Sequence, residues 1–157
     1  MKKLSYDRNG TGVFANRAQK NLEHIMKSAE NSVDVHPVTQ AILALLGIVV
    51  FPWETSALDI VKKQKLPLLS ENGWPKWNMS GARRVTDLGK LIEVLRHSIA
   101  HGNIEFTSDS KSPADVTISF TNIPRGKTKS DWVGTITGDQ LIEFCRCFSS
   151  AIKEQVK

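Results

Sequence analysis

Hydrophobic side chains recur every three or four positions in four stretches of the chain, which is the spacing of one face of an α-helix. These stretches cover residues 14–29, 38–50, 85–99 and 141–152. The second stretch is apolar on nearly every side, and such a helix is stable only when protein surrounds it. We therefore expect four long helices, with the second one innermost, and a short amphipathic helix at residues 56–64.

Three shorter runs follow the third long helix and alternate between apolar and polar residues, which is typical of half-buried strands. They cover residues 104–106, 116–120 and 132–136, and turn-forming residues separate them. The sequence predicts a mainly α fold with a small antiparallel ribbon of two or three strands before the last helix. Residues 66–82 are expected to form an ordered loop, because the two tryptophans in it need cover.

The length of the chain indicates a single domain. A chain of 157 residues usually folds around one hydrophobic core. Residues 1–12 are polar and contain two glycines, so we expect a flexible N-terminal arm followed by one domain at 13–157. The arm has no apolar stretch of a signal peptide. The longest apolar run, 41–51, is about half of what a transmembrane helix needs. A cytoplasmic protein without membrane contact is expected.

The net charge and the cysteine content exclude few kinds of binding partner or cellular compartment. Lys and Arg number 21 against 16 Asp and Glu, a formal charge of +5, which permits a polyanionic partner without requiring one. Cys145 and Cys147 lie two positions apart on a predicted helix and point in different directions, so neither a mutual disulfide nor a shared metal is expected. The absence of other cysteines favours a reducing compartment.

The most informative segment is LRHSIAHGNIEF, residues 95–106, at the end of the third long helix. It brings together Arg96, His97 and His101. At about 100° per residue, the two histidines lie opposite the apolar stripe and Arg96 lies at its border. We therefore expect these side chains to face a cleft or a partner.

Arginine combined with histidine suits the cleavage of RNA. A base must activate the 2′-hydroxyl, and an acid must protonate the leaving 5′-oxygen; histidine titrates near neutral pH and can do both. Arginine can donate two hydrogen bonds to the oxygens of the charged transition state. This chemistry requires no metal ion and no cofactor.

The segment resembles a motif of the HEPN domains (higher eukaryotes and prokaryotes nucleotide-binding). Arg96 and His101 have the R-x4-H spacing of that family, and His97 stands where the family usually has a polar residue. The AHGN continuation, residues 100–103, and the order of the helices are also similar to bacterial members.

The resemblance implies an up-and-down helical bundle and, for many members, a metal-independent endoribonuclease that cleaves single-stranded RNA and leaves 2′,3′-cyclic phosphate ends. It also implies a homodimer in which two R-x4-H motifs form one composite site. Such proteins act as toxins or phage-defence effectors, and a nucleotidyltransferase antitoxin is a candidate partner. The alternative is a non-catalytic HEPN-type module that binds nucleotide, RNA or a partner protein.

Four further residues are predicted to bind RNA: Arg83 and Arg84 at the start of the third helix, Lys76 beside Trp77, and Asn103. Basic residues next to an aromatic ring can hold single-stranded RNA. For each residue taken alone, a solvated surface position is the simpler interpretation.

Structural alternatives also exist for the motif itself. Arg96 could pair with an acid such as Glu93 or stabilise the C-terminus of the helix, and His101 could be a C-terminal cap residue. His97 and His101 have the spacing of helical metal ligands, but no third ligand is apparent, so no metal site is predicted. On a regular helix Arg96 and His101 are separated by roughly 140°, so one helix cannot direct both at one phosphate. A two-fold axis near the helix end would bring two copies of each around one groove.

Overall fold

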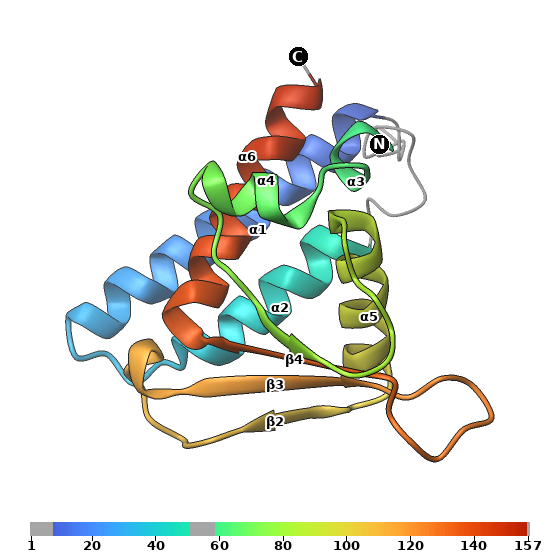
Figure 1. The fold of residues 1–157 in the computed structure, drawn as a ribbon. Coiled ribbons are helices and arrows are strands. Elements are labelled where there is room, and N and C mark those ends of the chain that lie inside the picture. The colour runs from blue at the N-terminus through green and yellow to red at the C-terminus, as the bar shows by residue number, and fades with distance from the viewer. Residues whose placement is uncertain (1–7, 51–58, 157) are drawn as a thin grey trace.

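The computed structural model describes residues 8–50 and 59–156 (Figure 1). The helices are α1 (Arg8–Glu30), α2 (Pro37–Val50), α3 (Asp59–Lys62), α4 (Leu66–Glu71), α5 (Leu88–Ala100) and α6 (Gly138–Val156), with a 3₁₀ turn η3 (Pro113–Asp115). The strands are β1 (Asn78–Ser80), β2 (Ile104–Phe106), β3 (Thr117–Asn122) and β4 (Trp132–Thr137). The mainly α fold class is confirmed.

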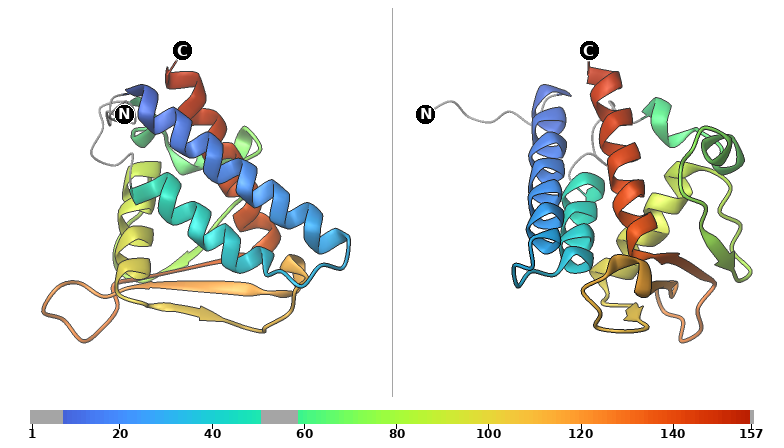
Figure 2. Two further views of the ribbon diagram at one scale, coloured as in Figure 1. Left: turned by 180° about the vertical axis from the view of Figure 1, so that it is seen from behind. Right: turned by 90° about the vertical axis from the view of Figure 1, so that its left-hand side faces the viewer.

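Helices α1, α2 and α6 pack side by side, as the two views of Figure 2 show. The apolar stripes of the sequence are buried between them: Leu22 of α1, Leu45 of α2 and Phe148 of α6 are completely inaccessible to solvent. Helix α5 contacts α2 on one side and β3 on another. It therefore connects the helical layer to the sheet at one side of the molecule (Figure 1).

The sheet has four antiparallel strands in the order β1–β4–β3–β2. Alternate residues of β3 and β4 are buried, so one face of the sheet joins the core through Ile118, Phe120 and Ile136. In Figure 1 the helices lie above this sheet, and α5 descends to the edge where β3 ends.

The sheet is larger than the predicted ribbon, because β1 comes from the segment expected to be a loop. Residues 66–82 contain α4 and then β1, whose Met79 pairs with Gly134 of β4. Strand β1 is Asn-Met-Ser, which has a single apolar side chain and none of the β-branched or aromatic residues that mark a strand in sequence, whereas the equally short β2 is Ile-Glu-Phe. The expectation that protein shields the tryptophans from solvent is confirmed for Trp77. Its side chain is buried, and its ring contacts Phe120 and Phe144 edge-on.

Two boundaries differ from the sequence expectations. Helix α1 begins at Arg8, so the prediction of a flexible arm is wrong for residues 8–12, while residues 1–7 lie outside the described part. The short helix expected at 56–64 is α3, whose described part is Asp59–Lys62, and residues 56–58 also lie outside it.

The two cysteines are free, as expected. Cys145 is fully buried, and burial raises the pKa of its thiol to about 12, so this side chain belongs to the core. Across the described residues, every helix is too short or too polar to cross a bilayer.

Candidate functional site

Both ends of α5, the helix that carries the R-x4-H motif, are held in place. At the N-terminus Asp87 is the cap: its carboxylate accepts a hydrogen bond from the backbone N–H of Lys90 over 3.0 Å. The helix therefore starts at Leu88 and not at Val85 as the apolar pattern suggested, because residues preceding a cap are extended.

Helix α5 ends at Ala100, and Gly102 follows it in a left-handed conformation. Gly102 has a φ of 68°, its N–H donates to the carbonyl of Ile99, and the N–H of Asn103 donates to the carbonyl of Ser98. This is the pattern of a Schellman motif. The carbonyl of Asn103 then accepts from the N–H of Thr121 on β3 over 3.0 Å. The last turn of α5 is thereby tied to the end of β3.

A groove opens beside this last turn, with a volume of about 430 Å³. We call it the α5 groove. Residues from α2, the segment before α5, α5, β3 and the β3–β4 connection line it: Leu46, Arg83, Glu93, Arg96, His97, Ala100, Asn122, Pro124 and Arg125. Two of the three predicted catalytic side chains, Arg96 and His97, are thus brought to one hollow.

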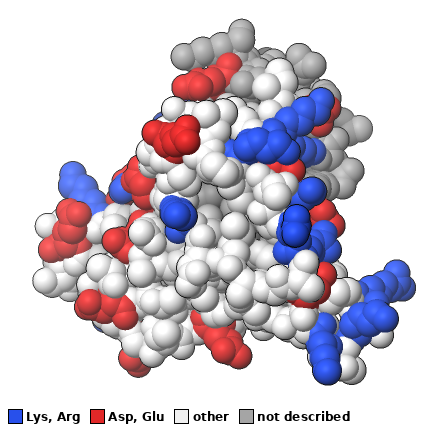
Figure 3. All heavy atoms as spheres, viewed as in Figure 1, with Lys and Arg blue, Asp and Glu red and all other residues white. Residues whose placement is uncertain are grey.

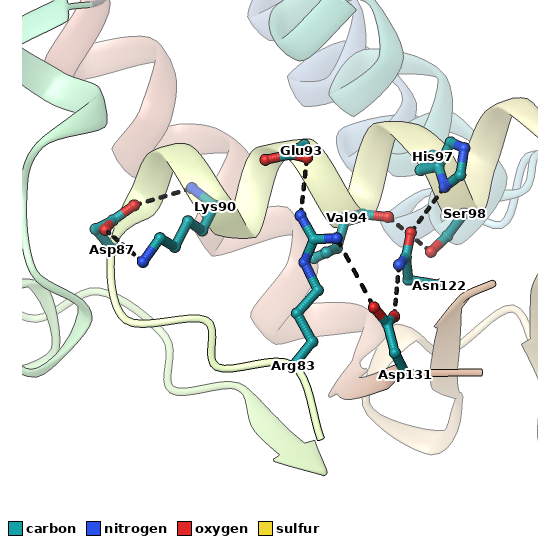
Figure 4. A network of polar contacts seen from close by, with 9 residues as sticks. All are labelled: Arg83, Asp87, Lys90, Glu93, Val94, His97, Ser98, Asn122 and Asp131. Carbon is teal, nitrogen blue, oxygen red and sulfur yellow. Dashed lines mark hydrogen bonds and ion pairs between the residues drawn. The ribbon is translucent and has the colours of Figure 1, made fainter. Parts of the chain in front are cut away.

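A chain of polar contacts runs along the groove (Figure 4). His97 Nδ1 lies 2.8 Å from Asn122 Oδ1, and Asn122 Nδ2 donates to Asp131 Oδ1 over 2.6 Å. Arg83 Nη1 lies 3.8 Å from Asp131 Oδ2, and Arg83 Nη2 donates to Glu93 Oε1 over 2.8 Å. The contacts connect α5 to β3, to the start of β4 and back to α5.

His101, the third predicted catalytic residue, is the C-cap of α5 and is exposed. It is therefore a capping residue, as the structural alternative proposed. Its ring stands edge-on to that of His97, with the ring centroids 4.6 Å apart and the planes at 87°. The two imidazoles are close, but His101 is not among the residues that line the α5 groove.

The four predicted RNA-binding residues do not gather at one place. Arg83 borders the α5 groove, but its guanidinium faces the carboxylates of Glu93 and Asp131. Arg84 is exposed, and Asn103 follows the end of α5. Lys76 borders a different hollow of about 570 Å³.

We call this second hollow the tryptophan pocket. Apolar side chains of α4, of the segment up to β1 and of α6 form most of it, among them Leu69, Trp74, Trp77, Met79 and Phe144. Lys65 and Lys76 are its ionisable residues.

Sequence reasoning missed Asn122, Arg125 and Asp131. A signal for Asn122 was present, because in β3 the buried positions alternate as Ile118, Phe120 and Asn122. A polar residue at an inward position needs a hydrogen-bonding partner. Arg125 and Asp131 lie in the connection between β3 and β4, where no periodicity identifies neighbours.

Basic side chains gather on the side of the molecule where the α5 groove lies. In Figure 3 Lys and Arg cover the lower right corner, over the β3–β4 connection, which carries Arg125, Lys127 and Lys129. Acidic side chains lie mostly on the left and along the bottom of that view. This basic connection borders the α5 groove, since Pro124 and Arg125 belong to the groove lining.

Among residues 8–50 and 59–156, no three His, Cys, Asp or Glu side chains are grouped as a metal site would require. The α5 groove instead combines an imidazole, guanidinium groups and an amide. Such groups can accept a proton and bind phosphate oxygens.

Comparison with known proteins gives one match. The model of the family described as HEPN pEK499 p136 matches residues 1–157, the whole of this sequence. No curated protein and no solved structure shows significant similarity to the chain.

Proposed function

Since this chain belongs to the HEPN family, we propose that it is an endoribonuclease that cleaves single-stranded RNA without a metal ion. The observation that carries the proposal is the α5 groove, in which Arg96 and His97 lie together and which the ring of His101 adjoins. In this proposal residues 13–157 are the catalytic domain, and α1, α2, α5 and α6 are the up-and-down bundle of the family.

The proposed reaction uses the 2′-hydroxyl of RNA as the nucleophile. One imidazole removes its proton, the 2′-oxygen bonds to the neighbouring phosphorus, and the bond from phosphorus to the 5′-oxygen breaks. The other imidazole gives its proton to that 5′-oxygen. Arg96 donates hydrogen bonds to the phosphate oxygens, where negative charge increases in the transition state. The products are a 2′,3′-cyclic phosphate and a free 5′-hydroxyl.

We further propose a homodimer that joins two α5 ends around one groove. His101 is exposed and is not among the residues that line the groove of its own chain, so it could serve the groove of a second copy. An apolar surface continues from the groove onto α2, where Leu43 is 55% exposed one turn before Leu46. A symmetric dimer would cover this surface. Light scattering should report a mass of about twice 17.5 kDa.

The biological role that we propose is that of a toxin or phage-defence effector acting on cytoplasmic RNA, with a nucleotidyltransferase-type antitoxin as candidate partner. Family membership is the support for this role. Co-purification with the product of a neighbouring nucleotidyltransferase gene would test it.

The decisive experiment is incubation of the purified protein with a single-stranded RNA and with DNA of the same sequence, both in EDTA. We expect RNA fragments with 2′,3′-cyclic phosphate ends and intact DNA, because DNA lacks the 2′-hydroxyl. The Arg96→Ala variant is the control for a contaminating nuclease. Cleavage of DNA, or loss of activity in EDTA, would contradict the mechanism. Binding of RNA without cleavage would favour the alternative of a non-catalytic module.

A further inference from the structure

The contacts between His97, Asn122 and Asp131 determine which nitrogen of His97 carries the proton. A carboxylate accepts hydrogen bonds and donates none, so the atom of Asn122 that lies 2.6 Å from Asp131 Oδ1 is the amide nitrogen. The other atom of that amide, its carbonyl oxygen, therefore faces His97 at 2.8 Å. A carbonyl oxygen is only an acceptor, so His97 Nδ1 is the donor.

We propose that Asn122 and Asp131 are positioning residues that hold His97 with its proton on Nδ1, so that Nε2 is the proton acceptor of the α5 groove. Figure 4 shows the second ring nitrogen of His97 turned away from Asn122. This inference rests on the proposed function in one respect, because it assigns His97 as the base that removes the proton from the 2′-hydroxyl. His101 is then the acid that protonates the 5′-oxygen.

Burial and backbone contacts make this arrangement rigid. Asn122 is only 2% exposed, so its amide is shielded from water that could replace either partner. The N–H of Asp131 donates to the carbonyl of Asn122, and the carbonyl of Asp131 accepts from the N–H of Arg83. The backbone on both sides of the amide–carboxylate contact is thus hydrogen-bonded, and an amide flip would place two acceptors against each other.

Arg83 completes the arrangement. Its guanidinium lies near the second carboxylate oxygen of Asp131 and donates to Glu93, one turn before His97 on α5. The approach of the Arg83 segment needs Gly81, because a Cβ there would lie 2.3 Å from the carbonyl oxygen of Asp131, and its φ of 109° also favours glycine. Through these contacts Arg83 connects Asp131 to α5 beside the groove.

The first experiment measures the tautomer directly, by long-range ¹H–¹⁵N correlation spectra of the histidine rings in the full chain without RNA. We expect neutral His97 to carry its proton on Nδ1 in the wild type. Asn122→Leu should remove this preference, and Asp131→Asn should retain it, because an asparagine carbonyl can still accept from the amide of Asn122. A proton on Nε2 of wild-type His97 would overturn the proposal.

The second experiment measures RNA cleavage by the same variants. Asn122→Leu should lower kcat about 10²-fold with little change in KM, because it disturbs a proton acceptor and leaves the phosphate contacts in place. Thr121→Ala, on the outward face of the same strand, is the matched control and should keep wild-type kcat. Circular dichroism verifies that each variant is folded.

The two experiments separate the inference from the proposed function. An Nδ1 proton that depends on Asn122 in a protein that does not cleave RNA would support the positioning and refute the ribonuclease. RNA cleavage that is equal in Asn122→Leu and the wild type would overturn the positioning role and leave the ribonuclease standing.

Discussion

The α5 groove and the tryptophan pocket differ in the chemistry of the side chains that line them. The tryptophan pocket is the larger, about 570 Å³, and mostly apolar side chains line it. The α5 groove is smaller, about 430 Å³, yet five of its nine lining residues are ionisable. In the pocket the aromatic rings join α6 to the sheet through mutual edge-on contacts. In the groove, Asn122 of β3 contacts the imidazole of His97, and Asp131 of the β3–β4 connection in turn contacts Asn122. Volume alone therefore does not identify the place where chemistry can occur.

The largest expected effect comes from removing one of the proposed catalytic side chains in or beside the α5 groove. Arg96→Ala and His101→Ala should each lower kcat/KM by roughly 10²–10⁴-fold, because a phosphate contact or a proton donor is lost. Arg96→Lys should recover only part of the activity, since an ammonium cannot donate two parallel hydrogen bonds. Thermal unfolding should be nearly unchanged. If both alanine variants cleaved RNA like the wild type, the site would lie elsewhere.

The opposite result is expected in the tryptophan pocket. Trp77→Ala should destabilise the fold by about 3–5 kcal/mol, because a buried indole is replaced by a cavity between β3 and α6. The activity of the folded fraction should not change. Urea unfolding provides the free energy, and Trp77→Phe, which retains an aromatic ring, is the control with a smaller loss. A variant that is stable but inactive would make the pocket part of the site.

RNA affinity should also distinguish the two regions. Arg125→Ala, tested in an inactive His101→Ala background, should weaken binding of single-stranded RNA and reduce the slope of log affinity against log salt by about 0.7, the loss of one phosphate contact. Lys76→Ala, at the edge of the tryptophan pocket, is the matched removal of one positive charge and should leave the slope unchanged. Equal slopes for both variants would mean that RNA also reaches the pocket.

The smallest effect is expected outside both hollows, where Arg146 of α6 donates two hydrogen bonds to Glu23 of α1. These bonds lower the pKa of the Glu23 carboxyl, so the pair stabilises the fold at neutral pH, and its contribution disappears as the pH falls through the carboxyl range. Both side chains are substantially exposed, so Glu23→Gln should cost about 1 kcal/mol or less.

Urea unfolding at neutral pH and at about pH 3 tests the sign. The difference between Glu23→Gln and the wild type should be present in the first condition and smaller in the second. A difference that increased on acidification would contradict the assignment. RNA cleavage should be equal in the two proteins, which makes this variant a baseline for the groove and pocket variants.

Periodicity predicted the long helices because each one buries a stripe of its own residues. The end of α5 was also predictable, since Gly102 provides the left-handed conformation that a Schellman motif needs. The start of α5 was placed at Val85 because the apolar pattern begins there. The helix starts after Asp87, which is its N-cap. Strand β1 was missed because Asn-Met-Ser lacks β-branched and aromatic residues, so that only its pairing with β4 identifies it as a strand.

Some residues of the candidate site were predictable from the sequence and others were not. Arg96, His97 and His101 are close in sequence, so one motif identified them together. Asn122 and Asp131 reach His97 only because β3 ends beside the last turn of α5 and β4 begins there. Such proximity depends on the tertiary structure, and one sequence contains no direct record of it. The buried polar position in β3 was the single local sign.

The order of the strands also determines when the site can exist during synthesis. The ribosome releases the chain from its N-terminus, so the helix with Arg96 and His97 leaves before Asn122 and Asp131. Until β4 emerges, β1 has no neighbour and the amide of Asn122 has no carboxylate to orient it. A nascent or truncated chain that stops before residue 131 therefore carries the complete R-x4-H motif without the contacts that hold His97. Assembly of the groove is a late event, which separates translation of the motif from the onset of whatever chemistry it performs.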